Sequence, residues 1–324
     1  MNRRETVLAL LALLAATRAS LGQQQAKRIG LLWIKSVGES SAYLQAFRDG
    51  LRAQGYAEGN NLEIVDRFLV ASYPQMADAA AKLVAEKVDV IACFGNTAIS
   101  AASRATTTIP IVFVSGTDPV KAGFALSLAR PGKNITGVTV INEEIGAKRL
   151  ELLTQAVPGL KLVAIPLNPD SISEINDFKE LEASTRSLGI KLRSVPVRHP
   201  GELESAMKGA VKAGVTAFAP MPSTIFFANA PKIIQAIEKT GLPAIYDERS
   251  YVRAGGLMSY GSDNAEKFRH VAVIVGKILK GANPGDLPIE QPMTLRMAVN
   301  LKTAKALGIK IPQSLLLQAD EVIQ

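Results

Sequence analysis

The chain has 324 residues, of which 48% are hydrophobic, 5% aromatic and 20% charged, with a single cysteine. This composition is typical of globular proteins and excludes a disordered, collagen-like or disulfide-stapled chain. The net charge of +8 comes from scattered basic residues that form no block, so the charge indicates a solvated surface rather than a nucleic-acid footprint. At this length, two domains are expected.

The first 22 residues have the pattern of a signal peptide. Arg3 and Arg4 precede a short apolar run, Val7–Ala16, and small residues follow at Ser20–Gly22. The run is shorter than the roughly 20 residues that span a membrane, so export with cleavage is expected, and an uncleaved anchor is the alternative. No cysteine follows the run, which argues against a lipoprotein anchor. The Arg pair leaves the route open between Sec and twin-arginine export.

From Lys27 to Phe113 the sequence predicts strand, helix, strand, helix, strand, helix, strand. The strands are short and almost wholly apolar, as in Ile29–Trp33, and each is followed by an amphipathic segment. Apolar strands that alternate with helices are typical of a parallel sheet covered on both faces. The predicted fold class is α/β, with a doubly wound sheet.

The same order of elements recurs from Leu160 to Tyr246 at nearly the same spacing. In both halves a glycine, Gly55 or Gly189, ends the first helix, and an apolar strand follows a few residues later. Two similar βα lobes with polar residues just past their strands predict a ligand between them.

Three segments are expected to connect the lobes, which makes closure a rotation with little internal rearrangement. We place them within Ser127–Val140, near Arg253–Gly256 and within Gly281–Pro292, and expect the helix Ala265–Leu279 to join lobe 1. The predicted units are a signal peptide (1–22), lobe 1 (27–139 and 255–285) and lobe 2 (140–254 and 286–324).

Open α/β sheets bind ligands at the carboxyl ends of their strands, where helix N-termini also present free N–H groups. In lobe 1 the residues at these ends are Ser40, Ser41, Gly95, Asn96, Thr97, Ser115, Thr117 and Asp118. Gly95 permits close approach of a ligand, and the helix that starts near Ala98 favours an anion such as a carboxylate. Asp118 either caps the next helix or binds an ammonium group.

In lobe 2 the corresponding candidates are Asn168, Ser223, Thr224, Tyr246, Asp247 and Glu248. We predict that Tyr246 stacks on an apolar part of the ligand, and that Asp247 or Glu248 neutralises an amine. All these residues are ligand-binding candidates.

Catalysis and cofactor binding are not predicted. His199 and His270 fall outside the strand-end loops, and Cys93 lies inside an apolar run, so no nucleophile has a base beside it. No metal-ligand spacing, Rossmann fingerprint or P-loop occurs. We therefore expect a protein that is not an enzyme and has no catalytic residues, no metal and no cofactor.

The chain resembles the ABC-transporter substrate-binding protein family typified by the tryptophan-binding TrpX-like proteins. The resemblance runs from about Arg28 to the end of the chain. The segments that carry it are AFRDGLRAQGY (46–56), TIPIVFV with DPV (108–120), SLARPGKNITG (127–137), KRLELL (148–153), LPAIY (242–246), AGGLMSYG (254–261), GDLPIEQP (285–292), NLKTAKALGI (300–309) and ADEVI (319–323).

This resemblance implies a periplasmic solute receptor of the type I periplasmic-binding-protein fold. Such a receptor acts as a monomer and delivers a small molecule, here an amino acid or another small carboxylate, to the permease subunits of an importer with a separate ATPase. Two other classes stay open: a ligand-sensing receptor domain of related fold, and an exported hydrolase. The leader argues against a DNA-binding sensor, and the lack of a nucleophile with a base argues against a hydrolase.

Overall fold

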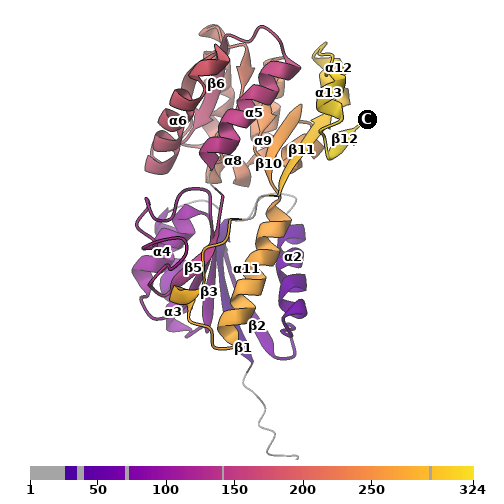
Figure 1. Cartoon of the computed structure of the whole chain (residues 1–324). Coiled ribbons are helices and arrows are strands. Elements are labelled where there is room, and N and C mark those ends of the chain that lie inside the picture. Colours follow the sequence, from indigo (N-terminus) through magenta and orange to yellow (C-terminus); the bar gives the residue numbers. More distant parts are fainter. Residues whose placement is uncertain (1–25, 35–39, 70–72, 141, 292–293) are drawn as a thin grey trace, which may run out of the picture.

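The computed structural model describes residues 26–34, 40–69, 73–140, 142–291 and 294–324, so the predicted signal peptide lies outside the described part. The chain forms two lobes, each with a sheet between layers of helices (Figure 1). The predicted α/β fold class with two lobes is confirmed. Among the described residues, no helix combines the length and apolar character that crossing a membrane requires.

Lobe 1 is built on a parallel sheet in the order β2-β1-β3-β4-β5. Its strands are apolar and buried on both faces, because α3 and α4 cover one face and α2 and α11 cover the other. The bounds are β1 (Lys27–Ile34), β2 (Leu62–Leu69), β3 (Val90–Phe94), β4 (Ile111–Ser115), β5 (Ile135–Thr139), α2 (Ser40–Ala53), α3 (Tyr73–Ala85), α4 (Asn96–Ala105) and α11 (Asn264–Leu279).

Lobe 2 has the sheet β7-β6-β8, which a bridge between Phe218 and Ala244 joins to a second sheet, β9-β10-β11-β12. Only β10 and β11 pair antiparallel among the described strands. The strands are β6 (Leu162–Leu167), β7 (Lys191–Pro196), β8 (Ala217–Phe218), β9 (Ile245–Tyr246), β10 (Met258–Ser262), β11 (Leu295–Asn300) and β12 (Glu321–Ile323).

Helices cover both faces of the lobe 2 sheets. Side chains of α5, α6, α12 and α13 pack into one core, and those of α7, α8 and α9 pack into the other. The helices are α5 (Asn142–Ala156), α6 (Ile172–Ser184), α7 (Leu203–Lys212), α8 (Thr224–Ala228), α9 (Ala230–Glu238), α10 (Arg249–Arg253), α12 (Leu301–Ala306) and α13 (Gln313–Leu316), with 3-10 turns η1 (Arg186–Leu188), η2 (Pro200–Glu202) and η3 (Pro284–Asp286).

The second connection between the lobes differs from its predicted position. Residues 255–285 were assigned to lobe 1, but β10 pairs with β9 and β11 in lobe 2, so the chain crosses only after Ser262. Gly261 makes this pairing possible, because a Cβ there would lie 1.9 Å from the Asp247 carbonyl oxygen. Residues 286–290 also depart from their predicted lobe: the Glu290 amide donates to Gly137 O (2.9 Å) beside β5.

Candidate functional site

A cavity of about 270 Å³ lies between the lobes, at the carboxyl ends of the strands. Lobe 1 contributes the ends of β1 and β3 and the start of α4, whereas lobe 2 contributes the loops after β6, β8 and β9 and the first turns of α6. The N-terminal part of α11 completes the lining through Asn264 and Phe268. The chain therefore places an inter-lobe cavity where the strand-end argument predicted a ligand.

One wall of this cavity is aromatic and is formed by Trp33, Phe94 and Phe268, and Phe227 of lobe 2 also lines the cavity. The rings of Phe94 and Phe268 stack 3.8 Å apart at 11°, and Trp33 meets Phe268 edge-on at 6.0 Å. The indole of Trp33 is oriented by its N–H, which donates to Asp66 Oδ1 (2.7 Å). Such a wall suits a flat apolar group.

The N-terminus of α4 also opens on the cavity. Gly95 has a φ of 95°, which favours glycine, and no side chain caps this helix. The Asn96 side chain is held by neighbouring loops instead: it accepts from Ser115 Oγ (2.9 Å) and donates to Thr117 Oγ1 (3.2 Å). The first-turn N–H groups, which have no partner within a helix, are thus left to a ligand or solvent.

Lobe 2 places two acidic side chains of α6 on the opposite wall, Glu174 and Asp177. Burial raises the pKa of Glu174 to about 7, although its carboxylate accepts from the Asn168 amide (2.7 Å). The Ser223 hydroxyl lies beside the Glu174 carboxyl and acts to lower the pKa of that group. The hydroxyl makes no hydrogen bond of standard geometry with a described group. Burial and the nearby Glu180 raise the pKa of Asp177 to about 6.

A smaller chamber of about 140 Å³ adjoins the cavity, and both are lined by Gly95, Gly116 and Asp247. The chamber contains Arg149 from α5 and Lys267 from α11, neither of which was predicted as a site residue. Burial lowers the pKa of both side chains, and neighbouring carboxylates, Asp247 among them, oppose the change. This end of the site is therefore charged, with Arg149 buried and Lys267 partly exposed.

The predicted site residues fall into three groups. Those that line the main cavity are Gly95, Asn96, Thr97, Thr117, Asn168, Ser223 and Asp247, and Ser115 lines the chamber. The side chains of Ser40, Ser41 and Thr224 lie outside the described part of the structure. The remaining three, Asp118, Tyr246 and Glu248, do not line either space.

Each of these three has a structural role instead. Asp118 Oδ1 accepts from the amides of Val120 (2.8 Å) and Lys121 (3.3 Å), which is the capping alternative. The prediction that Tyr246 stacks on a ligand is contradicted by its position, because the ring is buried in the lobe 2 core and stacks on Tyr251 at 5.0 Å. Tyr246 is the last residue of β9, and because helices cover both faces of this sheet, its side chain packs into a core as that of Ile245 does.

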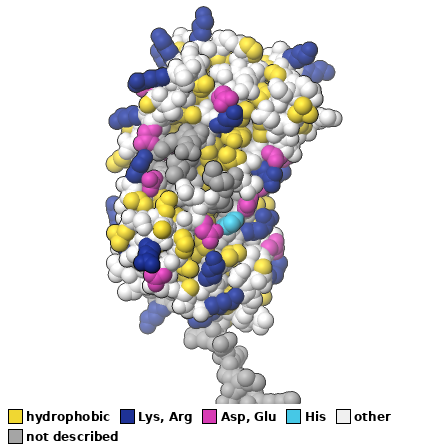
Figure 2. Space-filling view, viewed as in Figure 1, with side chains coloured by type: hydrophobic (Ala, Val, Ile, Leu, Met, Phe, Trp, Pro, Cys, Tyr) yellow, Lys and Arg dark blue, Asp and Glu magenta, His cyan; other side chains and the backbone are white. Residues whose placement is uncertain are grey.

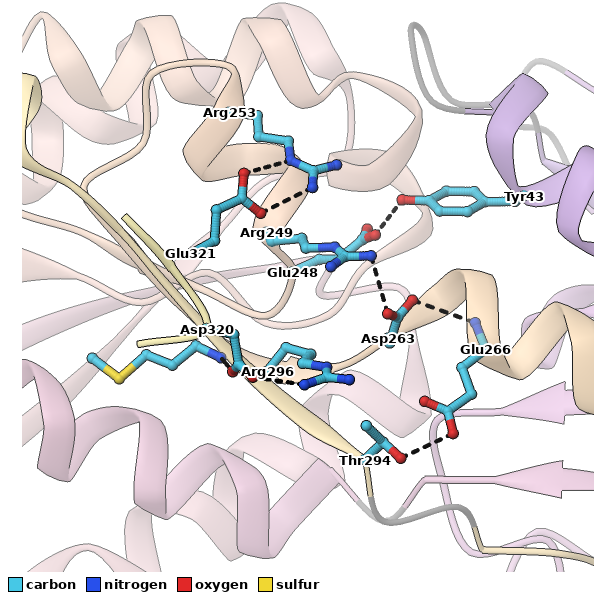
Figure 3. A network of polar contacts seen from close by, with 11 residues as sticks. Tyr43, Glu248, Arg249, Arg253, Asp263, Glu266, Thr294, Arg296, Asp320 and Glu321 are labelled. Carbon is cyan, nitrogen blue, oxygen red and sulfur yellow. Dashed lines mark hydrogen bonds and ion pairs between the residues drawn. The ribbon is translucent and has the colours of Figure 1, made fainter. Parts of the chain in front are cut away.

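Glu248 links the lobes rather than facing the cavity. Its buried carboxylate accepts a hydrogen bond from the Tyr43 hydroxyl of α2, which reaches across from lobe 1 (Figure 3). The Tyr43 ring also stacks near Phe227 of lobe 2, with centroids 6.2 Å apart. Elsewhere, Lys121 of lobe 1 pairs with Glu180 of lobe 2 at 3.7 Å. The lobes are thus in direct contact.

A polar network supports the connections beside this contact (Figure 3). Arg249 pairs with Asp263 at 3.0 Å, and Asp263 caps α11 by accepting from the Glu266 amide (3.3 Å). Thr294, after the third connection, donates to Glu266 Oε1 (2.9 Å). The start of α11 is therefore tied to both neighbouring connections, which orients its cavity-lining residues.

The histidines and the cysteine lie apart from the cavity. His199 Nδ1 accepts from the Gly201 amide in a turn, His270 contacts Glu290 at 3.0 Å, and Cys93 is buried, which raises the pKa of its thiol. Within the described residues, no three His, Cys, Asp or Glu side chains are grouped as metal ligands. Basic side chains are spread over the face seen in Figure 2 rather than gathered into a patch.

Comparison with known proteins agrees with this geometry. The family model described as "ABC transporter substrate binding protein" matches residues 35–323. The tyrosine-binding protein of Clostridioides difficile (strain R20291) is 24% identical over 285 residues, which cover 88% of this chain and 81% of the relative.

Two solved structures cover 92% of this chain and 100% of their own. An ABC domain from Streptococcus pneumonia in complex with L-Trp has a TM-score of 0.85 at 24% identity. The ligand-free, open form of a substrate-binding protein with adhesive properties from Clostridium difficile has a TM-score of 0.66 at 22% identity. Both structures therefore share the fold of this chain.

Proposed function

Because the chain belongs to the ABC transporter substrate-binding protein family, we propose that it captures a small solute between its lobes and delivers it, chemically unchanged, to a membrane permease. The permease subunits are driven by a separate ATPase, and the receptor acts as a monomer. The leader-like first 22 residues support export, which puts the mature protein in the periplasm.

The proposed solute is an aromatic amino acid. The observation that carries this choice is the aromatic wall of Trp33, Phe94 and Phe268, which shares one cavity with the carboxylate of Asp247. A ring packs favourably against such a wall, and an ammonium group pairs with a carboxylate in an enclosed site. The relatives named for tyrosine and bound to L-Trp support the same class.

Closure is the proposed mechanism. Lining residues come from both lobes, so a ligand makes its full set of contacts only when the lobes meet. Shifting an open-to-closed ratio from 99:1 to 1:99 requires a preference for the closed form of about 5.5 kcal/mol. Charge-assisted hydrogen bonds and aromatic packing at this site are of the right size to supply it.

Titration calorimetry of the protein without residues 1–22 tests the proposal, with L-tyrosine, L-tryptophan, L-phenylalanine, L-alanine and D-allose as ligands. We expect saturable one-to-one binding of the aromatic amino acids and weak or no binding of the other two. Trp33, the only tryptophan of the chain, lines the cavity and supplies a fluorescence readout for tyrosine and phenylalanine. Binding of the sugar alone would contradict the solute class.

Turnover is checked in the same samples. Chromatography of the solute after release is expected to recover it unaltered, as a transport receptor requires. Recovery of a cleaved product from amino-acid esters or amides would favour the exported hydrolase instead.

A further inference from the structure

The chamber beside the aromatic cavity contains charged side chains that form no ion pair with one another or with other described residues. Arg149, Lys267 and Asp247 line it, from α5, α11 and the loop after β9. The chamber meets the main cavity at Gly95, at the uncapped N-terminus of α4. It is therefore an enclosed extension of the proposed solute site.

Arg149 is the most informative of the three residues. Its side chain is 4% exposed, and the one hydrogen bond that it makes is from Nε to the Tyr260 carbonyl oxygen (2.9 Å). It forms no ion pair with any acidic side chain of the described chain, although Asp247 lies near enough to act on its charge. The two Nη atoms make no hydrogen bond within the described chain and keep accessible surface, so a carboxylate in the chamber can accept from both.

The other two charges complement Arg149. The Lys267 side chain is partly exposed and lines the chamber, and its ammonium group has no hydrogen bond or ion pair among the described residues. The Asp247 carboxylate is likewise unpaired within the described part of the chain. Two unpaired cations and one unpaired anion around about 140 Å³ match a carboxylate with an ammonium group next to it.

We propose that this chamber is the head-group subsite of the solute, in which Arg149 and Lys267 bind an α-carboxylate and Asp247 binds the adjacent ammonium group. The assignment rests on the proposed function and adds the chemistry that selects the solute. Arg149 belongs to lobe 2 and Gly95 to lobe 1, so a carboxylate between Arg149 and the start of α4 is held fully only in the closed form. Amines without a carboxylate are rejected because Arg149 stays unpaired.

Three matched probes test the subsite on the parent protein: L-tyrosine, tyramine, which lacks the carboxylate, and 3-(4-hydroxyphenyl)propionate, which lacks the ammonium group. Titration calorimetry is expected to show tyramine binding about 10- to 150-fold more weakly than L-tyrosine, the range for losing a hydrogen bond to a charged group. This comparison needs no variant, so it does not depend on whether a substitution folds.

Arg149→Gln and Arg149→Lys provide the second test. Glutamine still donates to Tyr260 O but has no charge, and lysine keeps the charge but loses the planar pair of donors. Both are expected to lose affinity for L-tyrosine, Arg149→Gln by about 10- to 150-fold, while their affinity for tyramine stays unchanged. Arg253→Gln is the matched control, since Arg253 pairs with Glu321 on the surface of lobe 2, outside the chamber.

The outcomes separate the subsite from the proposed function. If L-tyrosine and tyramine bind the parent equally well, or if Arg149→Gln binds L-tyrosine as tightly as Arg253→Gln does, the subsite is wrong and the receptor function survives. If the parent binds none of the aromatic amino acids and neither tyrosine analogue, the proposed solute class falls, and the assignment of the chamber falls with it.

Discussion

The two lobes present different chemistry to the same cavity. Lobe 1 contributes the rings of Trp33 and Phe94 and the start of α4, whereas the carboxyl groups, Glu174, Asp177 and Asp247, all come from lobe 2, which also contributes the ring of Phe227. Under the proposed function, recognition of the solute is therefore shared between the lobes, and its binding is coupled to closure.

Helix caps sharpen this contrast. In lobe 2, α6 is capped by Ser171, which accepts from the Glu174 amide, and the N-terminus of α11 is capped by Asp263. The N-terminus of α4 in lobe 1 has no side-chain cap and lies against the cavity. Side chains therefore accept hydrogen bonds from N–H groups at the N-termini of α6 and α11, whereas the free N–H groups at the N-terminus of α4 remain available to a ligand.

The acidic wall of lobe 2 is expected to destabilise that lobe near neutral pH, and this is the largest predicted effect. Burial raises the native pKa of Glu174 to about 7 from its usual 4.5, so the native state holds its proton more tightly than the unfolded chain does. Its contribution to stability is complete below pH 4.5 and is lost as the pH rises through about 7. Glu174→Gln removes this loss, about 3 kcal/mol.

Urea denaturation at pH 4.5 and pH 8 measures it, with the exposed Glu182→Gln on the same helix as control. We expect the free energy of unfolding to fall between these pH values more steeply in the parent and in Glu182→Gln than in Glu174→Gln. If the free energy of unfolding changes equally with pH in all three proteins, Glu174 is not a buried acid with a raised pKa.

A substitution of Asp247 tests whether the carboxyl groups of lobe 2 recognise the ammonium group of the solute. Asp247→Asn leaves the shape of the loop intact and removes the charge, so the affinity for L-tyrosine is expected to drop about 10- to 150-fold. The affinity for 3-(4-hydroxyphenyl)propionate should not fall, because that ligand has no ammonium group. Calorimetry compares both ligands, with Asp49→Asn on the surface of α2 as control. An unchanged affinity for L-tyrosine would contradict the role of Asp247.

Tyr43 tests whether contacts between the lobes outside the cavity contribute to closure. Tyr43→Phe keeps the ring beside Phe227 and removes the hydroxyl that donates to Glu248. We expect up to about tenfold weaker binding of L-tyrosine, with faster dissociation, because only the closed form loses stability. Stopped-flow fluorescence measures the rate, and Tyr56→Phe, a partly buried tyrosine in lobe 1, is the control. Equal rates would show that closure does not depend on this bond.

Asp118 gives the smallest expected effect, and the prediction separates a cap from a ligand contact. Asp118→Ala removes two hydrogen bonds to backbone amides in an exposed turn, so stability should fall by about 0.5–1 kcal/mol. The affinity for L-tyrosine should stay within twofold of the parent, because Asp118 does not line the cavity. A large loss of affinity without a loss of stability would indicate that Asp118 contacts the ligand.

The sequence predicts much of this architecture because strand-end position is a local property. Short apolar strands followed by helices predict parallel sheets, and the carboxyl ends of those strands carry Gly95, Asn168 and Asp247 to one cavity. The position of β10 was not predictable in the same way. Its apolar run fits either sheet, and the pairing partner, β11, comes later in the chain.

Residues on helices and at the buried ends of strands were missed. Arg149 lies in α5 and Lys267 in α11, and such side chains reach the cavity only because the crossings place these helices beside it. Trp33 and Phe94 resemble ordinary core residues of a strand. One signal was present: Asn264, Lys267 and Phe268 are spaced i, i+3 and i+4, so they share one helix face at the start of α11.

A crystal structure of the protein with L-tyrosine tests the central claim most directly. The account predicts density for one unaltered amino acid across both lobes, with its ring against Trp33 and Phe268, its carboxylate at Arg149 and its ammonium group at Asp247. Density confined to one lobe, a ring placed away from the aromatic wall, or an empty cavity with the amino acid bound elsewhere would contradict it.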